Sequence, residues 1–280
     1  MMSCVKKIMA GVGACVTLLV AGCAPEPSIV DDVDRYPSDV KQQKIEIVRD
    51  YPFDQSSFTQ GLEFDHEGNL LVSTGLKGKS RVYRIRDWEN TSKPSVSMPL
   101  HENIFGEGIA VFGDTLWQLT WRDHFAVRRD AETLEYQGLN IMEQEGWGAC
   151  STFDNVVTSD GSSSLYFRDP EDFRIDRVVD VTFGGQPLVN LNELDCSLDE
   201  AGEKWFVYAN VWHSDRIVKI DASTGRVVAV VDASEAVAEA KAMYKDIDVL
   251  NGVAKIPGRD SFVITGKFWP VMFEVKFINA

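Results

Sequence analysis

One carboxylate, Glu107, stands between two glycines, Gly106 and Gly108. Glycine permits close approach of a ligand or another backbone, and a charge in such a buried setting is costly unless it is paired or used. Burial among aromatic side chains would raise the pKa of Glu107 toward the range of a proton shuttle. We therefore expect acid–base catalysis by Glu107. The alternatives are a carboxylate hydrogen-bonded within a channel, or one that ligates a central cation together with Glu193.

Aromatic and polar residues recur near the ends of several short segments of the chain. If these ends face one opening, they form a pocket with aromatic walls and a few polar groups, the usual form of a small-ligand site. The expected lining residues are Phe58, Gln60, Phe105, Trp121, Trp147, Asn192, Trp212 and Lys267. For any single tryptophan, the alternative is a structural wedge between neighbouring sheets.

Five segments that resemble one another must position these side chains. They are Phe58–Phe64, Phe105–Val111, Gly146–Cys150, Leu191–Asp195 and Leu250–Ala254. They recur roughly every 40–60 residues, which is the repeat length of a propeller blade. The residue before the shared alignment point is polar or aromatic in every copy: Gln60, Glu107, Trp147, Glu193 and Asn251. In the fourth copy we expect Asn192, rather than the aligned Glu193, to face the pocket.

Further strands follow each of these segments, with clear apolar–polar alternation in Arg81–Arg86 and Arg216–Asp221. The fifth repeat lacks a fourth strand, and Lys44–Arg49 is a strand without a repeat of its own, so we expect it to complete the last blade and close the ring. Ala233–Lys245 is alanine-rich with apolar residues at helical spacing. The predicted fold is all-β: a five-bladed β-propeller over residues 44–280, with a short helical insertion between blades 4 and 5.

Residues 1–22 are predicted to be a signal peptide. Lys6 and Lys7 precede an apolar run, Ile8–Val20, that is too short to span a bilayer and is typical of a secretory leader. Leu19–Cys23 resembles a bacterial lipobox, which implies cleavage before Cys23 and lipid attachment to it. A plain signal peptide is the alternative.

Ala24 after the lipidated cysteine follows the sorting pattern of outer-membrane lipoproteins, so we expect the protein in the cell envelope, facing the periplasm. Residues 23–43 are polar and without pattern, and we interpret them as a flexible tether. Cys150 and Cys196 remain after removal of the leader, in a compartment where disulfides persist. They either form a disulfide or are two buried free thiols.

Composition and missing motifs exclude several functions. The formal net charge of −15 argues against a nucleic-acid partner or an anionic membrane face, so contact with the membrane is expected only through the lipid. The four histidines are scattered without metal-binding spacing, and there is no nucleophile elbow or phosphate-binding loop. We expect no metal in the active site and no cofactor, with a structural cation such as calcium in the channel as the alternative. A monomer is expected.

The ordered set of motifs resembles the plant-type glutaminyl cyclases, or glutaminyl-peptide cyclotransferases. The motifs include Phe58–Leu62, Ser73–Gly75, Phe105–Gly108, Leu119–Trp121, Gly146–Gly148, Leu191–Leu194, Ala209–Trp212, Leu250–Gly252 and Thr265–Lys267. The resemblance implies a five-bladed propeller that cyclises N-terminal glutamine of peptides and proteins to pyroglutamate, releasing ammonia without zinc. It makes Glu107 the general acid and base. Lys267, with Gln60 or Asn192, would polarise the amide oxygen.

The chain departs from the family pattern at Ala149 and Cys150, where Leu-Thr is more usual, and at Asp195, where Glu is usual. Two other functions stay open from the sequence. One is a lipid-anchored propeller that binds peptides or proteins without chemistry. The other is a calcium-dependent hydrolase with ligands from Glu107, Asn192, Glu193 and Asn251.

Overall fold

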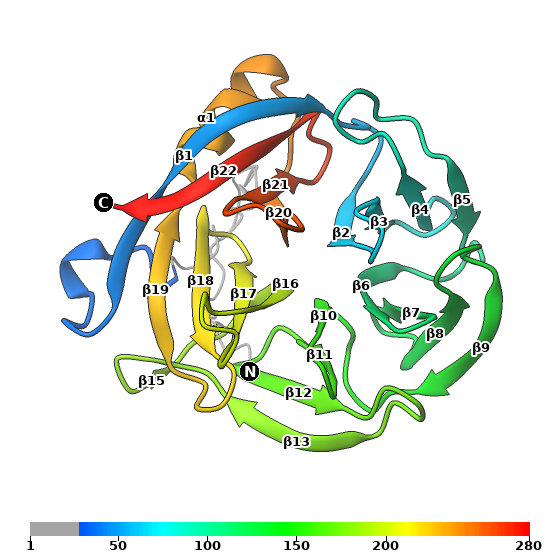
Figure 1. The fold of residues 1–280 in the computed structure, drawn as a ribbon, viewed down its shortest axis with the longest axis horizontal. Helices are drawn as coiled ribbons and strands as arrows, with labels where there is room; N and C mark the ends of the chain where they lie inside the picture. The colour runs from blue at the N-terminus through cyan, green and yellow to red at the C-terminus, as the bar shows by residue number, and fades with distance from the viewer. Residues whose placement is uncertain (1–27) are drawn as a thin grey trace, which may run out of the picture.

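The computed structural model describes residues 28–280, which form five blades of four strands each around a central axis (Figure 1). Blade 1 contains β2 (Thr59–Phe64), β3 (Leu70–Thr74), β4 (Arg81–Ile85) and β5 (Val96–Pro99). Blade 2 contains β6 (Gly106–Phe112), β7 (Thr115–Thr120), β8 (Phe125–Asp130) and β9 (Tyr136–Ile141). Blade 3 contains β10 (Ala149–Ser151), β11 (Val156–Thr158), β12 (Ser164–Arg168) and β13 (Ile175–Asp180).

Blades 4 and 5 share one eight-stranded sheet. Blade 4 contains β16 (Leu191–Leu198), β17 (Trp205–Val211), β18 (Arg216–Asp221) and β19 (Val227–Asp232). Blade 5 contains β20 (Leu250–Lys255), β21 (Phe262–Gly266), β22 (Val271–Asn279) and β1 (Lys41–Pro52). A two-stranded hairpin of β14 (Thr182–Phe183) and β15 (Gln186–Pro187) precedes blade 4. The predicted five-bladed, all-β propeller is confirmed.

Strand β1 closes the ring as the sequence predicts. It runs antiparallel to β22, with Ile45 opposite Phe277, and therefore supplies the missing fourth strand of blade 5. Its first residues also pair in parallel with β19, where Lys41 lies opposite Ala229. The outer edges of blades 4 and 5 are thus joined, which removes two edges from solvent.

The tether interpretation is wrong for residues 28–43, because they pack on blade 4. Val30 and Val40 are buried in the same apolar cluster as Phe183. Tyr36, next to the 3₁₀ helix Val33–Arg35, contacts the Phe183 ring edge-on at 5.3 Å between centroids. Ser214 Oγ donates to Asp31 at 2.6 Å. Few apolar residues in a polar segment suffice to dock it. The predicted leader and Cys23 lie outside the described residues.

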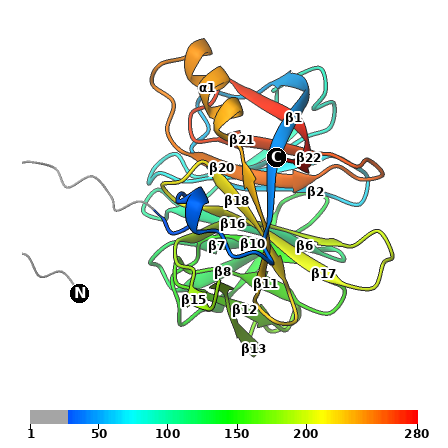
Figure 2. The same ribbon diagram turned by 90° about the vertical axis from the view of Figure 1, so that its left-hand side faces the viewer.

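The predicted helical insertion is α1 (Ser234–Met243), which connects β19 to blade 5. Its short alanine side chains, Ala236 and Ala240, are buried against blade 5, while Met243 is exposed. Figure 2 shows α1 toward the same end of the ring as the 3₁₀ helix. Within residues 28–280, no helix is long and apolar enough to span a membrane.

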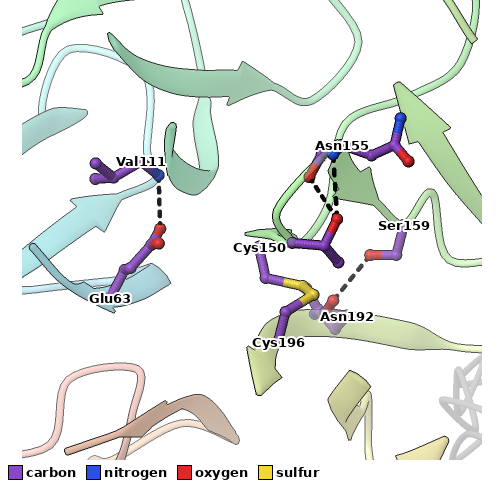
Figure 3. The surroundings of a disulfide bond; sticks show 8 residues. Glu63, Val111, Cys150, Asn155, Ser159, Asn192 and Cys196 are labelled. Carbon is purple, nitrogen blue, oxygen red and sulfur yellow. Dashed lines mark hydrogen bonds between the residues drawn. A yellow bond between two sulfur atoms is a disulfide. The ribbon is translucent and has the colours of Figure 1, made fainter. Parts of the chain in front are cut away.

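Cys150 and Cys196 form a disulfide between β10 of blade 3 and β16 of blade 4, with 5.4 Å between their Cα atoms (Figure 3). The two strands belong to neighbouring blades, so the bond links two inner strands directly. The same strands begin just after Trp147 and with Leu191-Asn192, which are parts of the site described next.

Candidate active site

The repeated segments form the inner strands, and their shared glycines are required by close packing. A Cβ on Gly108 would lie 2.6 Å from the Ala149 nitrogen, and one on Gly148 would lie 1.9 Å from the Asn192 carbonyl oxygen. Real Cβ atoms do not approach a neighbouring backbone this closely, so these two inner strands can contact the next one only through glycine. This contact explains why glycine recurs at the alignment point.

In four of the five blades, a polar residue next to or near the alignment point lies at a break in the strand pairing. The register between the first and second strands shifts between Thr59 and Gly61, between Gly106 and Ile109, between Leu191 and Leu194, and between Leu250 and Val253. A β-bulge leaves residues unpaired and re-aims their side chains. Four polar residues lie in these bulges: Gln60, Glu107, Asn192 and Asn251. Their side chains are therefore not committed to the regular strand pairing and are available to a site.

One cavity of about 250 Å³ brings together every residue that the sequence predicts for the site. It is lined by Phe58, Gln60, Phe105, Glu107, Trp121, Trp147, Asn192, Trp212 and Lys267. All five blades contribute, because the residues come from the starts of inner strands and the ends of second strands. The wedge alternative applies instead to Trp117 and Trp269, which are fully buried and whose Nε1 groups donate to backbone carbonyls.

Glu107 is a buried carboxyl group without a hydrogen-bond partner among residues 28–280; only 4 % of the residue is exposed. Burial raises the pKa of Glu107 well above its usual range; the positive charge of Lys267 opposes this and the negative charge of Glu145 adds to it. Lys267 is equally buried, and burial lowers the pKa of its amine, with Glu107 and Asp248 opposing. Its Nζ lies 4.7 Å from the centre of the Phe58 ring. The cavity thus holds an acid and an amine whose pKa values are drawn toward each other.

Two amides complete the polar part of the cavity. Asn251 Nδ2 donates to Gln60 Oε1 at 3.0 Å and to the Thr59 carbonyl at 3.0 Å, so the Gln60 amide is oriented with its oxygen engaged. The Gln60 NH₂ group is then left to donate to a ligand. Asn192 Oδ1 is buried and has no partner within the described part of the chain, so Asn192 has unused hydrogen-bonding capacity at the cavity.

The aromatic wall is held by Glu145, which the sequence reasoning missed. Its Oε2 accepts from Trp121 Nε1 at 3.0 Å and from Trp147 Nε1 at 3.3 Å, while Oε1 pairs with Arg122 Nε at 2.8 Å. The Arg122 guanidinium in turn lies 4.0 Å from the centre of the Trp121 ring. One carboxylate therefore orients two tryptophans from different blades. The only signal in the sequence is its position directly before Gly146.

Glu193 lies outside the cavity, as the preference for Asn192 predicts. Its Oε1 accepts from the Leu62 nitrogen at 3.1 Å and its Oε2 from the Val253 nitrogen at 2.7 Å, which ties three inner strands together. The neighbouring inner-strand carboxylate Glu63 likewise accepts from the Val111 nitrogen at 3.0 Å (Figure 3). These are structural carboxylates. Within residues 28–280, no group of three or more His, Cys, Asp or Glu side chains is arranged to hold a metal ion.

Fold and site together define a five-bladed propeller with an acid and an amine in an aromatic pocket on its axis. The chain belongs to the glutamine cyclotransferase family, whose model matches residues 15–277. It is 31 % identical over 239 residues to a glutaminyl-peptide cyclotransferase of Arabidopsis thaliana, which covers 85 % of this chain and 72 % of the relative. It also resembles the crystal structure of the Myxococcus xanthus glutaminyl cyclase, with a TM-score of 0.78, 33 % identity, and coverage of 86 % of this chain and 99 % of that one. The family expected from the motifs is confirmed.

Proposed function

We propose that this protein converts N-terminal glutamine of peptides and proteins to pyroglutamate with release of ammonia. The observation that carries the proposal is the single cavity in which an unpartnered carboxyl group, an amine and two amides face aromatic walls. Its volume of about 250 Å³ is below the range of about 300–1,000 Å³ of sites for drug-sized ligands, and suits one amino-acid residue. The names of the relatives agree with this activity.

The reaction needs a substrate held in its folded rotamer and a group that transfers protons. The α-amino nitrogen of the substrate attacks the carbon of its own γ-carboxamide, which closes a five-membered ring, and the C–N bond to the amide nitrogen breaks. Because the attack is intramolecular, the protein gains most by holding the folded rotamer. The Glu107 carboxylate takes a proton from the attacking amine and returns it to the departing nitrogen, which leaves as ammonia. Its raised pKa suits both steps.

Negative charge develops on the amide oxygen in the tetrahedral intermediate. Lys267 can stabilise that oxygen, with the free NH₂ group of Gln60 or the amide of Asn192 as a second donor. The aromatic walls, from Phe58, Phe105 and the tryptophans, exclude water and pack against the aliphatic part of the substrate. Of the four candidate calcium ligands, Glu193 accepts from the backbone nitrogens of Leu62 and Val253 through its two oxygens, which argues against a calcium site that includes it.

An assay with a Gln-initiated dipeptide tests this function. The purified protein should release ammonia and form the pyroglutamyl product, and EDTA should not abolish turnover. The same peptide with an acetylated N-terminus lacks the nucleophile and should not react. Absence of turnover by protein with an intact thermal transition would favour a propeller that only binds peptides. Loss of activity with EDTA would favour the calcium-dependent alternative.

We further propose that the protein is a monomeric lipoprotein, anchored through Cys23 to the outer membrane and facing the periplasm. The leader pattern supports the anchor, and the Cys150–Cys196 disulfide suits an oxidising compartment. Cys23→Ser should move the protein from the membrane fraction to the soluble periplasmic fraction. Retention of this variant in the membrane would contradict the anchor. Light scattering on the purified protein tests the monomer.

A further inference from the structure

The active cavity accommodates one residue, so the rest of a peptide substrate must leave it along the protein surface. A second depression of about 790 Å³ lies beside the cavity. Its lining includes Asp54, Thr74, Lys79, Tyr244, Asp246 and Phe268. None of these residues has a part in the proposed proton transfer.

Only an aromatic partition separates this groove from the active cavity. Phe58 lines the cavity and Phe268 lines the groove, and their ring centroids are 5.3 Å apart. Phe268 directly follows Lys267 of the active site, and its nitrogen donates to the Ser57 carbonyl at 2.8 Å. Its φ of 61° is in the left-handed region, which non-glycine residues seldom adopt. The chain therefore turns sharply at the point where the two depressions meet.

The walls of the groove come from two adjacent blades (Figure 1). Lys79 lies in the turn between β3 and β4 of blade 1. Tyr244 and Asp246 follow α1, in the insertion that leads into blade 5. The insertion is not needed to close the ring, since β1 does that. Forming one wall of a groove beside the active cavity gives it a function.

The charges in the groove fall into two groups. Asp54 and Arg81 form an ion pair at 2.6 Å, and the Asp54 carboxylate also accepts from Ser56, so both are engaged within the protein. Lys79 and Asp246 are exposed and make no side-chain ion pair or hydrogen bond within residues 28–280. Among the described residues, one unpaired cation and one unpaired anion thus line the groove, the first from blade 1 and the second from the insertion before blade 5.

We propose that this groove binds the residues that follow the N-terminal glutamine of a peptide substrate, with Lys79 selecting acidic and Asp246 selecting basic side chains. The inference rests on the proposed function, because it gives a binding site to the part of the same peptide substrate that follows the glutamine. An extended peptide advances about 3.3–3.6 Å per residue, so a few residues span the partition and enter the groove. Substrates of one residue cannot reach it.

Steady-state kinetics on substrates of increasing length test the groove. The substrates are glutaminamide, which has no following residue, and Gln-initiated pentapeptides whose later residues are neutral, acidic or basic. Lys79→Glu should lower kcat/KM for the acidic peptide and raise it for the basic one, each by about two- to fivefold, as expected for an exposed charge pair. Asp246→Lys should lower kcat/KM for the basic peptide by a similar factor. Glutaminamide turnover should not change in either variant.

Two results would overturn the groove. One is an unchanged preference among the pentapeptides in both variants, and the other is an equal loss on glutaminamide and pentapeptides. Binding measured with Glu107→Gln, in which the peptide stays intact, separates this test from the proposed function. If the wild type does not release ammonia from glutaminamide, the proposed function is refuted. The dissociation constants of the acidic, basic and neutral peptides still test whether the groove binds them, through their dependence on peptide charge.

Discussion

Glu107 and Glu193 are both buried carboxyl groups on inner strands, and burial raises the pKa of both well above the usual range. Their surroundings differ. Glu193 accepts hydrogen bonds from two backbone nitrogens, those of Leu62 and Val253. Glu107 has no such partner in the described chain and faces an aromatic cavity. A shifted pKa therefore does not by itself identify a catalytic group, because access to a ligand and freedom from structural bonds distinguish the two.

The comparison has a consequence for stability. A carboxyl group whose pKa is raised in the folded state contributes stability below its unfolded pKa, and that contribution is lost as the pH rises through the folded value. Glu107 should therefore weaken the fold at the alkaline pH values at which it is ionised. Glu193 is also buried, but its hydrogen bonds to the two backbone nitrogens offset part of that cost. In the proposed mechanism, the group that transfers the proton is therefore also a group whose ionisation costs stability.

The largest expected effect is that of Glu107→Gln. Removal of the proton shuttle should lower kcat by about 10²–10⁴-fold. The same substitution removes an acid that is costly to ionise, so the melting temperature should rise relative to wild type at pH 8 and differ less at pH 4. Ammonia release and calorimetry at the two pH values measure both effects. A variant that is inactive and also less stable at pH 8 would mean that Glu107 supports the fold.

Glu193→Gln is the matched substitution in the structural region. The amide has one acceptor oxygen, so one of the two backbone donors from Leu62 and Val253 loses its partner. We expect a loss of about 1–3 kcal/mol in the free energy of unfolding, with kcat per folded molecule close to wild type. Urea denaturation and active-site-normalised kinetics test this. Loss of kcat without loss of stability would mean that Glu193 has a part in the reaction and is not a structural carboxylate.

Removal of the disulfide should affect stability more than chemistry. Cys150→Ala with Cys196→Ala opens a loop of 46 residues, and we expect a loss of about 2–4 kcal/mol in the free energy of unfolding. KM should rise more than kcat falls, because the bond links the strands next to Trp147 and Asn192. A shift in the denaturation midpoint measures the first effect. If dithiothreitol lowers the stability of the double variant as much as that of the wild type, the effect does not come from this bond.

Glu145→Gln gives the smallest expected effect. It removes a negative charge that helps to raise the pKa of Glu107, so that pKa should fall. The acidic limb of the kcat/KM profile should then move to lower pH, by less than about one pH unit. Glu171, an exposed acid on blade 3, provides the control substitution Glu171→Gln. Equal shifts in both variants would assign the change to overall charge rather than to the cavity.

Much of the fold and of the cavity can be predicted from the sequence, because close packing of the inner strands requires glycine at equivalent positions of the repeats. Glycine recurs where Gly108 and Gly148 contact the next inner strand, and Glu107, which precedes Gly108, lies in a β-bulge. The packing of residues 28–43 does not follow from the sequence, because Val30 and Val40 are isolated apolar residues without periodicity. Glu145 was missed because its function depends on two tryptophans that approach each other only in the folded ring.

Titration of Glu107 itself tests the central claim most directly. The infrared difference between wild type and Glu107→Gln isolates the carbonyl stretch of the protonated Glu107 carboxyl group as a function of pH. We predict that this band persists to pH values well above those at which carboxyl groups usually ionise. The pH at which half of the band is lost should coincide with the acidic limb of the wild-type kcat/KM profile. A carboxylate that is fully ionised in the ordinary range, or a midpoint unrelated to the kinetic limb, would contradict proton transfer by Glu107.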